Sequence, residues 1–229
     1  MAREGYQDRL TELRGDVVTM ASIVLDQYEA AVEVLDSGDP AEAQRVIGDD
    51  QVLNDWYLDI ESDCVELIAL QQPVATDLRF IASSFKIVTD LERVGDLATN
   101  LARYGRDAGA EPLSPVEVGP IATEAGAMVE DAMDAYATED PDAAREVAAR
   151  DDDLDDQCRA ASEAVVRELL TTTDPGMGMD MDPGDVESTL AGVSHALLTI
   201  RDLERVGDHA VNICARTLYM VENDDALIY

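Results

Sequence analysis

The sequence predicts an all-α protein made of two tandem, similar three-helix bundles. Helix-forming residues dominate, and apolar residues recur at three- and four-residue spacing along most of the chain. No segment shows the alternating pattern of a β-strand. The segment Asp90–Asp96, DLERVGD, recurs unaltered as Asp202–Asp208, each time inside a long apolar-periodic stretch. An identical segment at equivalent places predicts an internal duplication.

Helix-breaking residues divide the chain into six expected helices. A Ser37-Gly38-Asp39-Pro40 break ends the first helix, and Asp39 is a good N-cap for the second, with Pro40 at its first position. Gln71-Gln72-Pro73 separates the second helix from the third. The helices are expected over roughly 4–36, 40–70, 75–106, 116–137, 141–170 and 186–221. The segments 108–115 and 171–185, rich in Gly and Pro, are expected to be a linker and a loop.

The two copies can be aligned residue by residue. Asp39-Pro40 recurs as Asp140-Pro141, an offset of 101, whereas the DLERVGD segments are offset by 112. The difference of 11 residues fits an insertion in the loop 171–185. We therefore expect one bundle over residues 1–110 and a second over 111–229.

The composition excludes several classes of protein. The chain carries 50 acidic and 16 basic residues, a net charge of −34, so direct binding to a nucleic acid is not expected. Because the acidic residues are spread along the chain, we interpret them as an adaptation to a salty solvent that screens their repulsion. The N-terminus lacks a signal peptide and no apolar stretch is long enough to span a membrane, which predicts a cytoplasmic protein. The three cysteines, Cys64, Cys158 and Cys214, are expected to be buried, reduced thiols.

The repeated segment places paired carboxylates on one face of a helix. Glu92 and Asp96 are four residues apart, as are Glu204 and Asp208. Neighbouring helices offer further oxygens, from Asp50 and Asn54 in the first copy and from Asp151 and Asp155 in the second. Such an all-oxygen set favours a hard cation such as Mg²⁺, Ca²⁺, Mn²⁺ or ferric iron. The alternative is structural: Arg93 and Arg205 are adjacent and could pair with these acids.

Two further features of the sequence bear on this site. Gly95 and Gly207 lie inside helices, where glycine is unfavourable, which indicates either a close helix–helix approach or a bound ion or partner. The two histidines, His195 and His209, form neither Glu-x-x-His nor HExxH. His209 adjoins Asp208 and could be a peripheral ligand, but it is expected to be an ordinary surface residue. There is no nucleotide-binding glycine motif and no assembled nucleophile and base, so the chain is not expected to be an enzyme.

The segment Gln72–Arg79, QPVATDLR, together with the two DLERVGD segments, resembles the PhoU family of phosphate-transport regulators over nearly the whole chain. The resemblance implies two similar three-helix bundles that bind multinuclear clusters of iron or zinc on acidic surface motifs. The implied ligands are Glu92, Asp96 and Asp50 in the first copy, and Glu204, Asp208, Asp151 and Asp155 in the second. Because Asn54 stands where the second copy has Asp155, the first site is expected to bind metal less well.

The resemblance also implies a function. Such proteins dampen uptake by a Pst-type phosphate ABC transporter, so the expected partner is the transporter's ATPase, which would hold the chain at the membrane periphery. Arg93 and Arg205 are candidate partner-binding residues, and the alternative is that they only brace their own helices. Two other functions stay open: a regulatory module of another ion transporter or transcriptional system, and a metal-dependent hydrolase. The oligomeric state, monomer or homodimer, is also left open.

Overall fold

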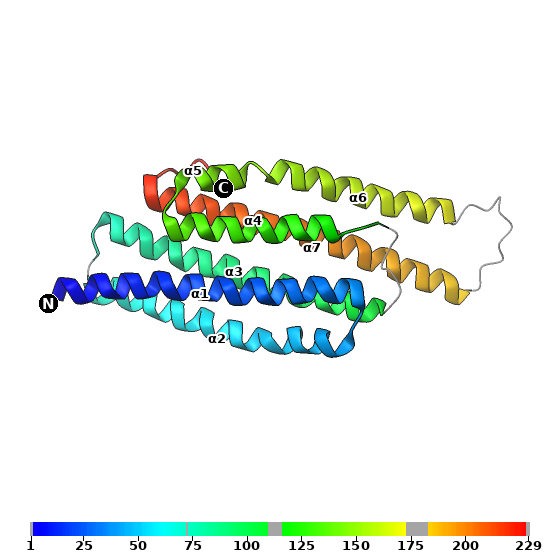
Figure 1. The fold of residues 1–229 in the computed structure, drawn as a ribbon, viewed down its shortest axis with the longest axis horizontal. Coiled ribbons are helices and arrows are strands. Elements are labelled where there is room, and N and C mark those ends of the chain that lie inside the picture. Colours follow the sequence, from blue (N-terminus) through cyan, green and yellow to red (C-terminus); the bar gives the residue numbers. More distant parts are fainter. Residues whose placement is uncertain (1, 72, 110–115, 173–182, 228–229) are drawn as a thin grey trace.

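The chain folds into long helices that run along one axis (Figure 1). The computed structural model describes residues 2–71, 73–109, 116–172 and 183–227, and these ranges contain seven helices and no strand. The helices are α1 (Ala2–Ser37), α2 (Pro40–Gln71), α3 (Ala75–Ala108), α4 (Gly119–Thr138), α5 (Pro141–Ala148), α6 (Asp151–Thr172) and α7 (Pro183–Glu222). The prediction of an all-α fold with two tandem three-helix bundles is confirmed.

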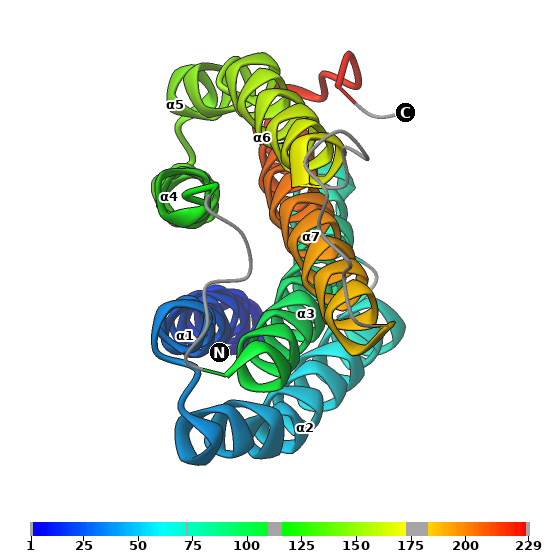
Figure 2. The same cartoon turned by 90° about the vertical axis from the view of Figure 1, so that its right-hand side faces the viewer.

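The first bundle consists of α1, α2 and α3, and the second of α4, the pair α5 and α6, and α7. Seen along the long axis, the two bundles lie against each other through α3 and α7 (Figure 2). The α2–α3 hairpin turns at one end of the molecule and the α6–α7 hairpin reaches the opposite end (Figure 1). The two equivalent hairpins, α2–α3 and α6–α7, therefore lie at opposite ends of the molecule.

The prediction of one continuous fifth helix over 141–170 is wrong, because the structure divides it into α5 and α6. The chain turns at Ala149 and Arg150, between α5 and α6, although neither residue is a helix breaker. The Arg150 side chain reaches α4, where its Nε lies 2.8 Å from Glu124 and its Nη1 2.5 Å from Asp131. Three aspartates follow in the first turn of α6, where negative charge is favourable at a helix N-terminus.

The Asp-Pro breaks have the structure that the sequence predicts. Asp39 Oδ1 accepts a hydrogen bond from the Ala41 amide at 2.8 Å, and Asp140 Oδ1 accepts two, from the amides of Asp142 and Ala143. The preceding helices also end alike: Gly38 has a φ of 63° and the equivalent Glu139 a φ of 55°. A left-handed residue at this position is strained for glutamate, and Arg14 of α1 forms an ion pair with the Glu139 side chain.

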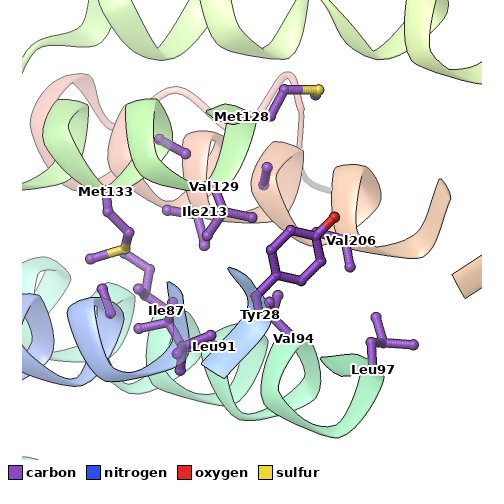
Figure 3. Packing of buried hydrophobic residues seen from close by; sticks show 14 of the residues in the cluster. Tyr28, Ile87, Leu91, Val94, Leu97, Met128, Val129, Met133, Val206 and Ile213 are labelled. Atoms are coloured by element: carbon purple, nitrogen blue, oxygen red, sulfur yellow. The ribbon is translucent and has the colours of Figure 1, made fainter. Parts of the chain in front are cut away.

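One continuous apolar core runs through both bundles. Tyr28 of α1 points into the second bundle, where Figure 3 shows it beside Val206, and a Cβ added to Gly126 of α4 would lie 2.9 Å from its ring. Its hydroxyl donates to the Ala122 carbonyl at 2.8 Å. A second buried bond joins the hydroxyls of Ser84 and Tyr136 at 2.7 Å. These contacts join the two copies into one packed body.

Candidate functional site

The glycine of each repeated segment is the place where two helices of a bundle approach closely. A Cβ atom added to Gly95 would lie 2.0 Å from Leu53 Cδ2, and one added to Gly207 would lie 2.3 Å from Leu154 Cδ2. Both distances are far inside van der Waals contact, so an added side chain would require the leucine to move. Each glycine thus leaves a gap that a leucine of the neighbouring helix fills, which favours the helix-packing interpretation over a bound ion.

This approach brings the predicted carboxylates together in two clusters. We call Asp50, Glu92 and Asp96, with Asn54, the first cluster. The second cluster is Asp151, Asp155, Glu204 and Asp208. In the sequence, Leu53 lies between Asp50 and Asn54, and Leu154 lies between Asp151 and Asp155. The leucine that fills each glycine gap therefore holds these residues beside α3 or α7.

The second cluster concentrates negative charge without neutralising it. Partial burial, followed by the charges of Asp155 and Asp208, raises the pKa of Asp151 from 3.8 to about 6. Burial and the charge of Asp155 likewise raise the pKa values of Glu204 and Asp208. The Oδ1 atom of Asp151 is buried and has no hydrogen-bond partner. An orphaned carboxylate oxygen among other carboxylates is a favourable place for a cation.

The first cluster is better satisfied by the protein itself. The Asn54 side-chain amide donates to the Asp50 carboxylate at 3.2 Å and to the Asp50 carbonyl at 3.0 Å. Burial, together with neighbouring carboxylates, raises the pKa values of Glu92 and Asp96. The single change from Asp155 to Asn54 thus replaces a repulsion with a hydrogen bond.

The arginines adjacent to these carboxylates do not pair with them. Arg205 Nη1 lies 3.9 Å from Asp202 Oδ1 on its own helix, while Arg93 is exposed and only partly offsets the raised pKa of Glu92. Within the described ranges, none of the seven cluster carboxylates has a cationic side chain at ion-pair distance. The ion pairs that the structural alternative expects are therefore not formed among the described residues, although Arg205 partly offsets the raised pKa of Asp208.

Neither cluster forms a ready-made coordination sphere. In the part of the chain that the structure describes, no three His, Cys, Asp or Glu side chains have the spacing of a metal-binding group. Cys158 lies close to the second cluster, where burial and the charges of Glu204, Asp155 and Asp208 raise the pKa of its thiol to about 12. The thiol is therefore neutral, and the ligand atoms that the clusters offer are oxygens.

A buried polar contact between the two copies was not expected from the sequence. His209, predicted at the surface, is only 6% exposed, and its Nδ1 lies 2.9 Å from the buried Asp90 Oδ1 of the other copy. Asn212 also donates to Asp90, at 3.2 Å. In the equivalent place, the Tyr104 hydroxyl donates to the buried Asp202 at 3.1 Å. Asp90 and Asp202, the first residues of the two repeated segments, therefore each join α3 to α7. In the sequence, the only sign of this role is that both copies have aspartate at this position.

No described helix has the length and apolarity needed to cross a membrane.

Comparison with known protein families matches both bundles to the same family. The sequence model of the PhoU domain matches residues 17–105 and 120–217, one segment in each bundle. The chain belongs to the PhoU family.

Relatives and solved structures of this family match over nearly all of the chain. A PhoU homolog of Pseudomonas putida, a phosphate-specific transport system accessory protein, is 36% identical over 96% of this chain and 82% of its own length. The Escherichia coli accessory protein PhoU is 31% identical over 96% and 86%. The crystal structure of PhoU from Pseudomonas aeruginosa covers 96% of this chain and 100% of its own, with 33% identity and a TM-score of 0.84. The phosphate transport system regulatory protein PhoU from Streptococcus pneumoniae covers 96% and 98%, with 25% identity and a TM-score of 0.81.

Proposed function

We propose that this protein regulates phosphate uptake by docking to the cytoplasmic ATPase of a Pst-type phosphate ABC transporter and lowering transport when phosphate is plentiful. The observation that carries the proposal is the match, across both bundles, to relatives named phosphate-specific transport system accessory proteins. Regulation by docking requires that the protein bind one state of its partner more tightly than the other. Since the ATPase of such a transporter faces the cytoplasm, we expect the protein to be cytoplasmic. It would reach the membrane only by binding this partner.

We further propose that the second cluster holds metal ions, of which iron and zinc are the candidates, and that the first cluster holds them more weakly. The orphaned Asp151 oxygen, the raised pKa values and the absence of arginine partners among the described residues support a cation there. A bound cation would supply positive charge that lets this acidic face approach a partner, because unpaired like charges oppose docking. In the first cluster Asn54 already satisfies Asp50, so less is gained from a cation.

Metal content tests this assignment separately from transport. The double change Glu204→Gln/Asp208→Asn should lower the metal bound per chain by more than half and remove the rise in melting temperature that metal produces. The change Glu92→Gln/Asp96→Asn should have a smaller effect. The matched control is Asp55→Asn/Asp59→Asn, which neutralises an exposed pair with the same spacing on α2. Unchanged metal content in the Glu204/Asp208 variant would exclude the second cluster as the site.

Arg93 and Arg205 are proposed as anchors for carboxylates or phosphates of the partner. Both are exposed beside the clusters, and the 3.9 Å contact of Arg205 with Asp202 leaves most of its guanidinium donors available. That same contact supports the simpler role of bracing α7.

The functional experiment is deletion of the gene followed by complementation. The deletion strain should keep phosphate uptake high in phosphate-replete medium, and the wild-type gene should restore repression. Normal repression without the gene would refute the regulatory function. An Arg93→Ala/Arg205→Ala protein that is folded and fully restores repression would refute only the anchor role.

A further inference from the structure

Large apolar side chains are exposed at equivalent positions in the two copies. Leu78 at the start of α3 and Leu190 near the start of α7 are 42% and 51% exposed, and they are related by the same offset of 112 as the DLERVGD segments. Two further pairs obey the offsets of the repeat. They are Val74 with Val186, and Val65 with Val166.

Two other exposed apolar residues, both on α2, do not follow the repeat. Leu58 is 57% exposed, but the equivalent position in the second copy is Arg159. Val52 is 50% exposed and corresponds to Asp153. Single exposed apolar residues of this kind are ordinary on protein surfaces. Three pairs that persist in both copies, on a chain with a net charge of −34, are a different pattern and indicate a surface that is kept apolar for contact.

The paired residues lie within about two helical turns of the hairpin ends, one set at each end of the molecule. We call Val65, Val74 and Leu78 the first end patch, and Val166, Val186 and Leu190 the second end patch. The first lies where α2 ends and α3 begins, and the second on the last turns of α6 and the first turns of α7, two regions that Figure 1 shows at opposite ends of the molecule. Figure 2 is viewed from the side of the second hairpin, whose end projects toward the reader. Since the 40-residue helix α7 alone is about 60 Å long, folded partners at the two ends would not collide.

The position of the patches argues against a second copy of this chain as the occupant. A chain with equivalent adhesive patches at opposite ends would join others end to end into an open filament rather than a closed dimer. The charge of −34 on each copy would also oppose that contact. The glutamates beside the patches are paired within the chain, Glu66 with Arg9 and Glu163 with Arg167. The charge that a partner meets is therefore the overall −34, which fits a different protein with an apolar surface and a net positive charge.

We propose that one molecule of this protein binds two copies of the same partner, one on each end patch. The inference rests on the proposed function, because the partner we assign is the transport ATPase, of which an ABC transporter carries two. Equivalent patches made by an internal duplication suit two identical subunits, each of which meets the same apolar side chains. The two ends then act as separate, similar sites on one rigid body.

The test is the stoichiometry of the complex with the purified ATPase, measured by light scattering after size-exclusion chromatography. The wild-type protein should bind two ATPase subunits. Leu78→Asp and Leu190→Asp should each bind one, with at least a tenfold loss of affinity at the changed end, and the double variant none. Leu58→Asp is the matched control, because it adds the same charge at a leucine that is at least as exposed and lies outside the end patches, and it should still bind two.

The outcomes separate this inference from the proposed function. A wild-type complex with a single ATPase, or Leu78→Asp and Leu190→Asp variants that still bind two, would overturn the two-patch inference and leave the function intact. A wild-type protein that does not bind the ATPase at all would overturn both. Circular dichroism should show that each variant is folded, and the milder changes Leu78→Ser and Leu190→Ser replace any that is not.

Discussion

At the scale of single residues, the difference between the clusters depends on Asn54 and Asp155, which occupy equivalent positions. Burial is the largest cause of the raised pKa of Asp151, about 6 in the folded protein against 3.8 ordinarily, and the Asp155 charge is the next largest. A group whose pKa is higher in the folded state stabilises the fold at low pH, and this stabilisation is lost as pH rises through about 6. The metal-free protein should therefore melt a few degrees higher at pH 5 than at pH 7.5.

Exchanging these two residues tests the cause. Asp155→Asn gives the second cluster the asparagine that the first cluster has at the equivalent position. It should reduce both the pH dependence of the melting temperature and the amount of metal bound at the second cluster. Asn54→Asp should do the reverse at the first cluster, where it removes the hydrogen bonds to Asp50. Differential scanning calorimetry of chelator-treated protein, with metal analysis of the untreated protein, measures both. If the pH dependence of Asp155→Asn matched that of the wild type, the Asp155 charge would not contribute to the raised pKa of Asp151.

The sequence could predict this asymmetry because both residues lie in helices whose register is set by the repeat. The spacing of four residues defines one helix face, and the offset of 101 aligns Asn54 with Asp155. The environment of His209 could not be predicted in the same way. Its burial depends on how α7 crosses α3, and the equivalent residue in the first copy is Leu97, so the repeat gives no warning of the contact with Asp90.

At the scale of elements, the contact between α3 and α7 is held by buried polar groups as well as by apolar packing. His209→Leu replaces the imidazole with an apolar side chain of similar size, as at the equivalent Leu97, and leaves Asp90 with Asn212 as its remaining donor on α7. The loss of a partner for a buried acceptor should lower the free energy of unfolding by about 1–3 kcal/mol. Urea unfolding in high salt measures this change.

A double-mutant cycle separates this bond from the packing around it. Asp90→Ala removes the acceptor, so adding His209→Leu to it should cost less than His209→Leu costs alone. Strictly additive effects would show that the two side chains are close but not coupled. The equivalent bond from Tyr104 to Asp202 offers a comparison, in which Tyr104→Phe removes only the hydroxyl.

The helices themselves were more predictable than their contacts. Asp39-Pro40 and Asp140-Pro141 carry local start signals, and both cap the following helix as expected. The break at Ala149 and Arg150 has no such local signal, since both residues suit a helix. There Arg150 binds acidic side chains of α4, a tertiary contact that a reading of neighbouring residues cannot reveal.

At the scale of the whole molecule, the main electrostatic effect is repulsion. Arginine ion pairs join several helices, as Arg9 joins α1 to Glu66 of α2, but exposed pairs contribute about 0–1 kcal/mol each. With 50 acidic and 16 basic side chains, most carboxylates have no cation to pair with. Salt weakens both effects, and because the repulsion involves many more charges, screening should stabilise the fold.

We therefore expect the melting temperature to rise by about 10 °C or more between 0.1 M and 3 M KCl, followed by circular dichroism at the helix band. The Debye length shortens from about 10 Å to below about 3 Å over this range, and most of the shortening occurs below about 1 M. Screening predicts that most of the rise occurs in that lower range. A neutral osmolyte such as sucrose, which favours burial without screening, should not reproduce that dependence. Equal melting temperatures at the two concentrations would contradict the interpretation of the acidic surface as an adaptation to salt.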